Sequence, residues 1–264
     1  MSTPEPHQIV CMKWGDRYGA EYVNRLYKML ADQCRGPFRL VCQTDDASGV
    51  RPEVECVDCP AIDIPAPQCL AGWRKVTLWK EQVPGLESGR DALFIDLDTV
   101  LTGPVDDFFT YQPSPEAFGP AARGGSSFVV IKNWPQPDKR IGNTSLYRFR
   151  VGEQPHIYET LMSRTAETLG RFPNSQSYIS ATAHDMAFWP EEWCRSFKVH
   201  CVPKGVRRYY QEPAVPEGAR VIAFPGRPDP GDAVLGKWPA PPHKRIYKHI
   251  RPATWIADAW GETA

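Results

Sequence analysis

The chain has 264 residues, with 31 Lys and Arg against 31 Asp and Glu, so its formal net charge is zero. A general nucleic-acid or anionic-membrane binder needs an excess of positive charge, and this composition argues against that class. Hydrophobic residues make up 42% and charged residues 23% of the chain, which excludes wholesale disorder. Proline is unusually common, with 27 residues. Because proline interrupts helices, long helices cannot dominate the fold.

The first third of the chain predicts a β-α-β unit. Residues 8–14 form a short apolar run that predicts a buried strand, and residues 18–30 carry apolar side chains at helical spacing. A second strand is expected at residues 38–42. Two strands joined by a helix are typical of a parallel sheet. The proline-rich residues 53–67 predict a loop with one short strand.

The remainder of the chain continues this alternation. Residues 73–83 predict a helix and residues 92–95 the strongest strand. Further strands are expected at 127–132, 145–149, 197–202 and 220–224, and further helices at 157–169 and 185–193. No repeat or linker interrupts the chain. We therefore expect one α/β domain over residues 1–264 with a mixed, mostly parallel sheet, and a C-terminal extension rich in Pro and Trp over residues 231–264.

The N-terminus and the cysteines indicate where the protein resides. The sequence MSTPEPHQ lacks the basic and apolar regions of a secretory signal, and no apolar run is long enough to predict a transmembrane segment. Cys56 and Cys59, with Cys69, resemble half of a zinc site that no second pair completes. We expect free thiols and a cytoplasmic protein.

Two carboxylates follow the strongest strand. Asp96 and Asp98 are one residue apart, and side chains at i and i+2 of an extended chain point to the same side. The carboxyl edge of an open α/β sheet is where ligands bind. Repulsion between two carboxylates is relieved by a cation, and Mg²⁺ or Mn²⁺ suits carboxylate oxygens and the phosphates of a nucleotide. The alternative is a strand end with two solvated Asp side chains.

Two enzyme classes use such a strand end. The run from Asp96 to Leu101, DLDTVL, fits the first motif of haloacid-dehalogenase-like Mg-dependent phosphatases, in which the first Asp would be the nucleophile. Nucleotide-sugar glycosyltransferases of the GT-A fold instead bind a metal through a D-x-D motif. The phosphatase motif usually opens its domain, whereas two predicted strands precede it here, and the late acidic motif of that class is absent.

The order of further sequence blocks resembles bacterial GT-A glycosyltransferases, distantly similar to the glycogenin and lipopolysaccharide galactosyltransferase group. The similarity covers about residues 8–230, and its blocks are KWG at 13–15, TDD at 44–46, GWRK at 72–75, FIDLDT at 94–99, NTS at 143–145, HD at 184–185, SFKVHC at 196–201 and FPGRP at 224–228. The resemblance implies a single GT-A, Rossmann-like nucleotide-diphospho-sugar transferase domain. It also implies metal-dependent hexosyl transfer from a nucleotide-sugar donor, expected to be a UDP-sugar, with retention of configuration. The acceptor is an unknown glycan, lipid or protein, and no nucleic-acid partner is expected.

Four residues are candidates to bind the nucleotide part of the donor. Tyr18 would stack on the base, and Asp45 would accept a hydrogen bond from the base or ribose. Lys75 and Lys198 would offset diphosphate charge, Lys198 at the leaving group. The alternatives are a packed aromatic ring, a turn-forming Asp and solvated lysines.

Two residues are candidates to hold the donor sugar. Asn143 and Asp185 match the resembling blocks and carry polar groups suited to sugar hydroxyls, although a turn Asn and a helix-capping Asp are the alternatives. The residue after Asp185 is Met186 where the group tends to have Gln. In that group the Gln lies near the reacting sugar carbon, so the departure concerns the catalytic step.

A second departure concerns the metal. The group places a third metal ligand, a His, where this chain has Pro225, which offers no donor atom. Either His200, His243 or water would complete the shell, or metal binding is weak or lost. A catalytically degenerate nucleotide-sugar-binding protein is therefore an alternative to the transferase.

Overall fold

The computed structural model describes residues 5–118 and 128–262, which form two compact units. Of the described residues, the first unit comprises 5–23, 36–97, 107–118 and 128–189, and the second comprises 24–35, 98–106 and 190–262. No helix in the described ranges is both long and apolar enough to span a membrane. The single domain over residues 1–264 with an extension from residue 231 stays a prediction.

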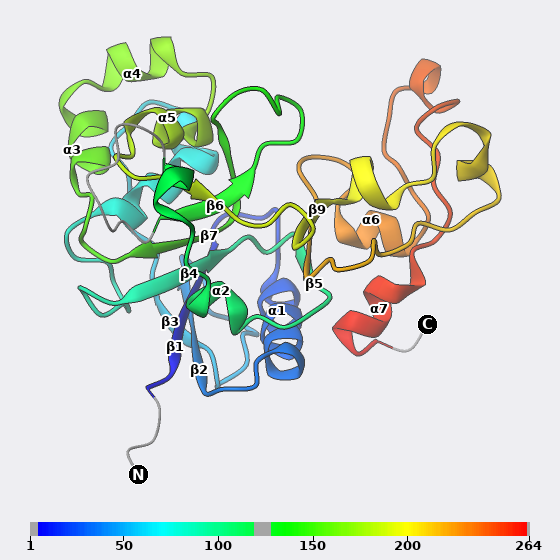
Figure 1. Ribbon diagram of the computed structural model, residues 1–264, viewed down its shortest axis with the longest axis horizontal. Helices are drawn as coiled ribbons and strands as arrows, with labels where there is room; N and C mark the ends of the chain where they lie inside the picture. The colour runs from blue at the N-terminus through cyan, green and yellow to red at the C-terminus, as the bar shows by residue number, and fades with distance from the viewer. Residues whose placement is uncertain (1–4, 119–127, 263–264) are drawn as a thin grey trace. The chain divides into compact units, whose positions relative to one another are not determined.

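A seven-stranded sheet organises the first unit, in the order β3-β2-β1-β4-β7-β6-β8 (Figure 1). Neighbouring strands are parallel except that β7 is antiparallel to both β4 and β6. The predicted α/β class with a mixed, mostly parallel sheet is confirmed. The strands are β1 (His7–Lys13), β2 (Phe38–Thr44), β3 (Glu55–Asp58), β4 (Asp91–Ile95), β6 (Val129–Lys132), β7 (Gly142–Arg150) and β8 (Ala187–Phe188).

Several strands end at the same side of this sheet, which is the edge formed by the carboxyl ends of its parallel strands. Because β1, β2 and β4 are parallel, Lys13, Thr44 and Ile95 all end at that edge. The antiparallel β7 begins there, with Leu146 opposite Ile95. The residues after β1, β2 and β4 and the first residues of β7 therefore share one edge.

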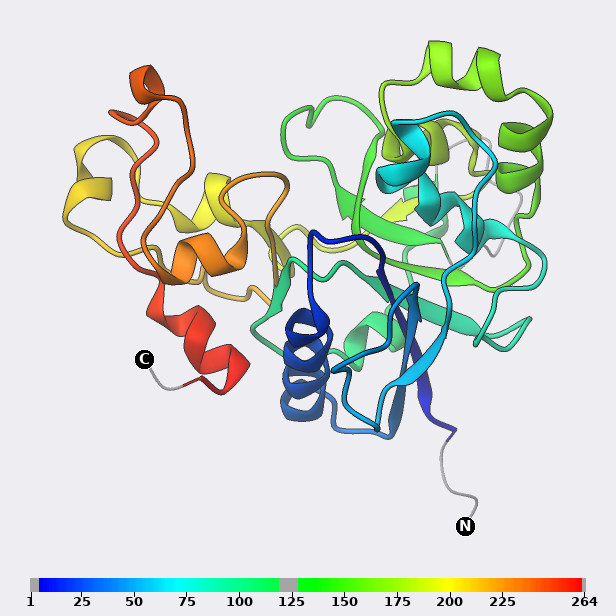
Figure 2. The same cartoon turned by 180° about the vertical axis from the view of Figure 1, so that it is seen from behind.

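Aromatic packing fills the core on one face of the sheet. The ring of Trp79 meets Phe128 edge-on at 4.8 Å between centroids, and the Tyr147 ring stacks on Phe94 at 5.0 Å. Trp79 ends a 3₁₀ helix, Gly72–Trp79, that packs beside α3 (His156–Ser163) and α5 (Ser175–Thr182). Figure 2 shows these helices grouped together with α4 (Thr165–Arg171).

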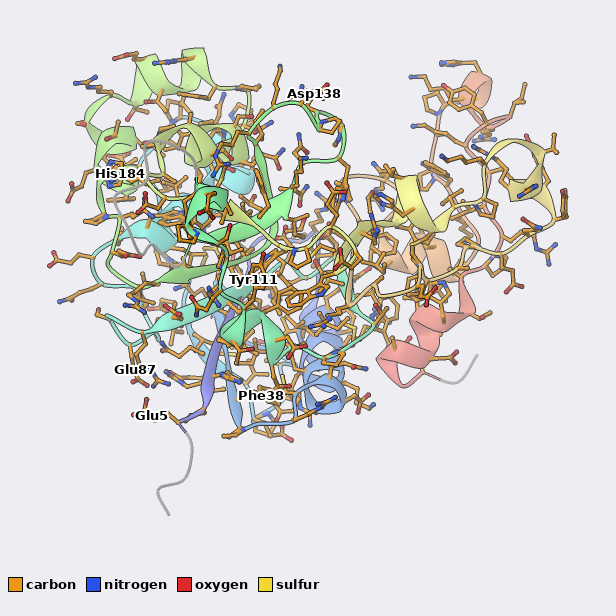
Figure 3. All side chains as sticks on the ribbon, viewed as in Figure 1. Glu5, Phe38, Glu87, Tyr111, Asp138 and His184 are labelled. Atoms are coloured by element: carbon orange, nitrogen blue, oxygen red, sulfur yellow. The ribbon has the colours of Figure 1, made fainter. Side chains whose placement is uncertain are left out.

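Further helices and ion pairs complete the description of the first unit. The helix α1 (Ala20–Gln33) follows β1, and its residues from Asn24 onward are counted with the second unit. The short helix α2 (Asp107–Thr110) packs beside β4. Short 3₁₀ turns lie at Gln68–Leu70 and Pro115–Phe118. Near the start of β4, Arg90 pairs with Glu87 at 2.7 Å and Glu5 at 3.4 Å; both acidic residues are labelled in Figure 3.

The second unit contains a three-stranded sheet in the order β5-β10-β9. Its strands are β5 (Thr99–Leu101), β9 (Cys194–Ser196) and β10 (Val221–Ala223). The Phe197 ring stacks on Phe224 at 4.5 Å, and Arg25 lies over the Trp260 ring at 4.0 Å. The helices are α6 (Pro230–Val234) and α7 (Thr254–Trp260), with 3₁₀ turns at Gly205–Tyr209 and Pro242–Lys244.

Most predicted strands are confirmed within a few residues. The helix expected at 18–30 is α1, and the strand expected at 145–149 extends over Gly142–Arg150. The strand expected at 127–132 is β6, although residue 127 lies outside the described residues. The apolar patterns of the sequence do not predict the strand β5 or the helices α2, α5, α6 and α7.

The predicted helix over 157–169 is wrong in its continuity, because it is broken at Arg164 into α3 and α4. The Ser163 hydroxyl donates to the Glu159 carbonyl at 2.8 Å, and the Thr165 hydroxyl donates to the Leu161 carbonyl at 2.9 Å. Side-chain donors that take backbone carbonyls compete with the helical ladder. The spacing of apolar residues carries no information about this competition, so it predicts one continuous helix.

The predicted helix over 185–193 is wrong, because Ala187–Phe188 form the strand β8 and residues 191–193 form a turn. The backbone N–H groups of Ala187 and Trp189 donate to the carbonyls of Phe128 and Val130 at 3.0 and 3.1 Å. Pairing with β6 supplies hydrogen bonds that a helix would otherwise provide, and Pro190 cannot donate one. The strand β8 therefore closes this end of the sheet.

The predicted strand over 197–202 is also wrong. The segment Phe197–Cys201 is a turn of π-helix, and the strand β9 lies just before it. Both end residues of the turn, Phe197 and Cys201, are buried. Their spacing of four residues fits a helical face as well as a strand face, so a short apolar run does not distinguish the two.

Candidate functional site

Asp96 is held at the carboxyl end of β4 by two neighbouring segments. Its backbone N–H donates to the Ser145 carbonyl at 2.8 Å, which joins it to β7. The ammonium of Lys75, from the 3₁₀ helix, lies 2.6 Å from Asp96 Oδ2 and 3.3 Å from the Thr144 carbonyl. Lys75 is buried, and the Asp96 side chain keeps 22% of its surface exposed. The buried Lys75 therefore orients the Asp96 carboxylate, and part of that carboxylate remains exposed to solvent.

Opposing effects act on the Asp96 carboxyl. Burial raises its pKa, while the Lys75 ammonium, the Ser145 side chain and the charge of Arg17 favour the ionised form. Below it, the phenol of Tyr147 is fully buried, and burial together with the Asp96 charge raises the pKa of Tyr147. The phenol of Tyr147 therefore stays protonated at neutral pH.

Hydrogen bonds join the loops after β1 and β2. The Gly15 N–H donates to Asp45 Oδ2 at 2.9 Å, and the buried Lys13 donates from Nζ to the Asp46 carbonyl at 2.8 Å. The Thr44 hydroxyl donates to the same carbonyl at 2.8 Å. One oxygen of the predicted nucleotide contact Asp45 is thus used to hold the first loop, and the residue itself is exposed.

Tyr18 lies in the loop between β1 and α1. Its ring contacts Tyr22 at 4.8 Å between centroids, and the Arg17 guanidinium lies 5.0 Å from its centre. In the preceding residues, Trp14 Nε1 donates to the Leu70 carbonyl at 3.1 Å. This sheet edge therefore presents an aromatic residue next to a cation, in the loop where a stacking residue was predicted.

Arg140 links the segments that carry the two predicted sugar contacts. Asn143 is buried, and its side-chain oxygen accepts the Ser145 N–H at 3.0 Å. Asp185 is buried just before β8. The Arg140 guanidinium, from the segment leading into Asn143, donates to the carbonyl of Met186. The structure thus ties the start of β7 to the residue that follows Asp185.

The other predicted site residues belong to the second unit. Asp98 is partly exposed and directly precedes β5. Lys198 Nζ donates to the carbonyl of Pro225, and burial lowers the pKa of Lys198, with a further contribution from Lys248. His200 Nδ1 accepts the Ser196 N–H at 3.0 Å, and burial lowers the pKa of His200. Lys198 is therefore held against the segment in which the sequence departs from the expected metal ligand.

The available carboxylates fit one kind of metal site. Within residues 5–118 and 128–262, no three His, Cys, Asp or Glu side chains form a cluster that could cage a metal ion. Mg²⁺ is typically bound by one or two carboxylates together with substrate phosphates rather than by an all-protein cage. Asp96 belongs to the first unit and Asp98 to the second, and the metal site expected from this pair stays a prediction. All eight cysteines are free in the structure.

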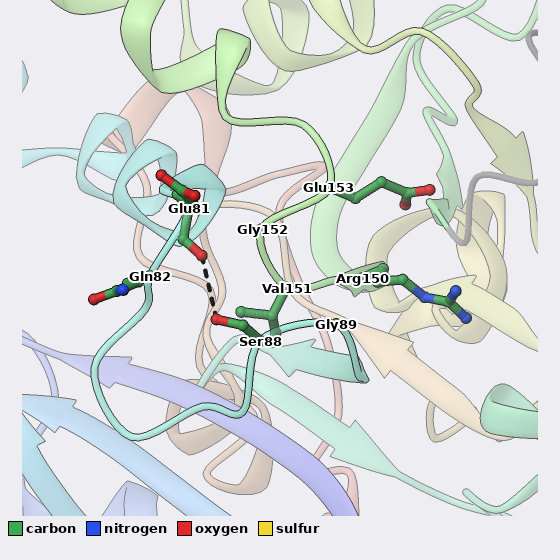
Figure 4. A pocket seen from close by; sticks show the side chains of 8 residues that line it. All are labelled: Glu81, Gln82, Ser88, Gly89, Arg150, Val151, Gly152 and Glu153. Atoms are coloured by element: carbon green, nitrogen blue, oxygen red, sulfur yellow. Dashed lines mark hydrogen bonds between the residues drawn. The ribbon is translucent and has the colours of Figure 1, made fainter.

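A surface hollow of about 410 Å³ lies elsewhere in the first unit (Figure 4). Its lining includes Gly89, Arg150 and Val151, which flank the start of β4 and the end of β7. Asp96 follows the other end of β4. The hollow therefore belongs to the opposite edge of the sheet, and backbone and mixed-charge side chains line it.

The sequence patterns gave no site role to some residues at the candidate site, although Lys13 and Ser145 lie within the blocks KWG and NTS. They are Lys13, Arg17, Arg140 and Ser145. Lys13 and Arg17 flank the end of the first predicted strand, and a charged residue in the first βα loop of a parallel sheet is the signal that would have identified them. No local signal identifies Arg140, because its contact with Met186 joins residues 46 positions apart.

No family model matches the chain, and no curated protein matches its sequence. Solved structures do match its fold. The galactosyltransferase LgtC, solved in complex with donor and acceptor sugar analogs, aligns with a TM-score of 0.62 at 9% identity over 96% of this chain and 95% of its own. The chain has a GT-A glycosyltransferase fold.

Two further glycosyltransferases align with this GT-A chain. GlyE of Streptococcus pneumoniae TIGR4 gives a TM-score of 0.57 at 10% identity over 97% of this chain, which spans 64% of GlyE. The bifunctional glycosyltransferase WbbM gives 0.52 at 13% identity over 85% of this chain and 46% of its own. At these identities the likeness concerns the fold. The GT-A fold implied by the ordered sequence blocks is confirmed.

Proposed function

We propose that the protein is a glycosyltransferase that moves a hexose from a nucleotide-sugar donor, a UDP-sugar, to a glycan, lipid or protein acceptor. The observation that carries this proposal is the placement of Asp96 at the carboxyl end of β4, with its carboxylate 2.6 Å from the Lys75 ammonium. The GT-A fold supports it, since LgtC has been solved with donor and acceptor sugar analogs on that fold.

Asp96 and Asp98 would hold Mn²⁺ or Mg²⁺ together with the donor diphosphate. When bound, the ion offsets negative charge that develops on the departing nucleoside diphosphate. Lys75, which the sequence predicted to offset diphosphate charge, would instead act as a positioning residue, because its ammonium fixes the Asp96 carboxylate before a donor arrives. The free energy needed to orient that carboxylate is then supplied by folding, and no reorientation is needed during the reaction.

The other predicted contacts have separate tasks. Tyr18 stacks on the base and Asp45 binds the base or ribose, while Lys198 assists at the leaving diphosphate. Asn143 and Asp185 orient the donor sugar. Transfer with retention of configuration follows from the sequence resemblance.

Binding without turnover is the second candidate function, and two residues favour it. Pro225 offers no metal-ligating atom where a His is expected, and Met186 replaces the expected Gln. A protein with these changes would keep the nucleotide contacts while its chemistry is weakened or lost. The phosphatase alternative predicts a covalent phosphate on Asp96, and the GT-A fold favours the transferase over it.

A thermal-shift screen tests the donor site. UDP, GDP and their hexose conjugates are added with and without Mn²⁺, and we expect the uridine nucleotides to raise the melting temperature most, in a Mn²⁺-dependent way. An Asp96→Asn variant should lose the Mn²⁺-dependent part. If no nucleotide shifts the transition, both the transferase and the binding protein are wrong. A shift without donor turnover selects the second candidate.

A further inference from the structure

Two segments of the second unit form a surface rich in basic and apolar side chains. The Arg208 guanidinium donates to the Tyr247 carbonyl, and the Tyr209 hydroxyl donates to the Ile246 carbonyl. The Tyr209 ring stacks on His249 at 4.8 Å between centroids. These contacts hold residues 203–211 against residues 241–251; Figure 1 shows the two segments side by side in yellow and orange-red. We use the name basic–apolar face for the side chains that these two segments turn to solvent, among them Val206, Arg207, Tyr210, Lys244, Ile246 and Tyr247.

The charge of the basic–apolar face differs from that of the whole chain. Residues 203–211 and 241–251 contain seven Lys and Arg residues and no Asp or Glu, although the chain is neutral overall. The acidic residue nearest to them in the sequence is the exposed Glu212, which directly follows the first segment. A neutral composition argued against an anionic-membrane binder, but attraction to an anionic surface depends on local charge within a Debye length, roughly 10 Å at ordinary salt.

The apolar side chains of this face are turned to solvent. Ile246 is 75% exposed and Val206 is 71% exposed, more than any other large apolar side chain in the described parts of the chain. Tyr210 and Tyr247 are exposed as well. Single exposed apolar residues are ordinary, but a group of them among basic side chains marks an interaction surface.

We propose that the basic–apolar face docks on an anionic lipid surface. Lys and Arg side chains are attracted to acidic headgroups, tyrosine suits the interface, and exposed aliphatic side chains gain by entering the acyl boundary. A nucleic acid would use the basic and tyrosine side chains. It would gain little from Val206 and Ile246, because phosphates and base edges form polar contacts that aliphatic side chains cannot make. The two aliphatic residues therefore favour a membrane.

Vesicle co-sedimentation of the full chain tests this proposal, and no donor is added, so the result is independent of transferase activity. The protein should sediment with vesicles that contain phosphatidylglycerol, not with phosphatidylcholine alone, and added salt should weaken binding. Arg207→Gln and Lys244→Gln should each lower the apparent affinity about fivefold. Ile246→Glu should lower it about tenfold.

Leu235→Glu is the matched control, because Leu235 is also an exposed apolar residue of the second unit, 62% exposed, but lies outside both segments. This variant should bind vesicles as the wild type does. The proposal is overturned if the wild type ignores phosphatidylglycerol vesicles at low salt, or if Ile246→Glu and Leu235→Glu bind alike. Retention of a labelled DNA duplex in place of vesicles would identify the face as a nucleic-acid surface instead.

Discussion

The Lys75 ammonium lies 2.6 Å from Asp96 Oδ2 at the carboxyl end of β4. Lys75 comes from the 3₁₀ helix Gly72–Trp79, twenty-one residues earlier in the chain. Burial would otherwise favour the protonated carboxyl, and the nearby cation keeps the ionised form accessible. This pair makes the proposed metal-binding carboxylate a feature of the folded chain before any ligand binds.

Removing Lys75 should raise the acid limit of donor binding, which is the pH below which Mn²⁺-dependent binding is lost. Burial raises the pKa of Asp96 and Lys75 opposes that rise, so Lys75→Met leaves the carboxyl with a still higher pKa. As the pH falls, protonation then begins at a higher pH, so Mn²⁺-dependent binding should be lost at a higher pH than in the wild type. Binding measured by thermal shift across pH checks this.

Lys80→Met is the control for that shift, because the Lys80 ammonium lies over the Tyr158 ring, 4.7 Å from its centre, at the end of the same helix. Its acid limit should match the wild type. Equal limits in Lys75→Met and the wild type would mean that Lys75 does not tune Asp96.

Tyr18 should contribute to nucleotide affinity through its ring. Tyr18→Ala should weaken UDP binding about tenfold, whereas Tyr18→Phe keeps a stacking face and should bind nearly as the wild type does. Titration calorimetry with UDP and Mn²⁺ gives both dissociation constants. If the Ala and Phe variants weaken binding equally, the hydroxyl rather than the ring matters.

The predicted sugar contacts should separate binding from turnover. Asp185→Asn and Asn143→Ala should lower the rate of donor turnover about a hundredfold through misplacement of the sugar, with little change in UDP affinity. Steady-state kinetics beside UDP titrations makes the comparison. A parallel loss of UDP affinity would indicate a structural role instead. That role is the alternative to test, because both residues are buried.

Trp79 should be a main source of stability in the first unit. Its buried ring contacts Phe128 and Phe149, so Trp79→Ala should lower the free energy of unfolding by about 3–5 kcal/mol. Trp79→Phe should cost less, since it keeps a ring and removes an indole N–H that is buried without a hydrogen-bond partner. Urea unfolding followed by circular dichroism measures both, and equal losses would contradict the packing account.

Local sequence predicted the parts of the fold that repeat simple patterns. The apolar runs that become β1, β2 and β4 are buried in the sheet, and Asp96 follows β4 as expected. Long-range pairing decided the other elements. The segment around Ala187 is extended because it pairs with β6, which lies more than fifty residues earlier. Arg140 reaches Met186 for the same reason, and no local pattern encodes such a contact.

The most direct test of the central claim is release of UDP from UDP-hexoses by wild type and Asp96→Asn, each with and without Mn²⁺. Lys80→Met serves as the folded control. The proposal predicts Mn²⁺-dependent UDP release by the wild type and by Lys80→Met, and a loss of about a hundredfold or more in Asp96→Asn. Release that is equal in Asp96→Asn and the wild type, or that does not depend on the metal, would contradict the assignment of Asp96.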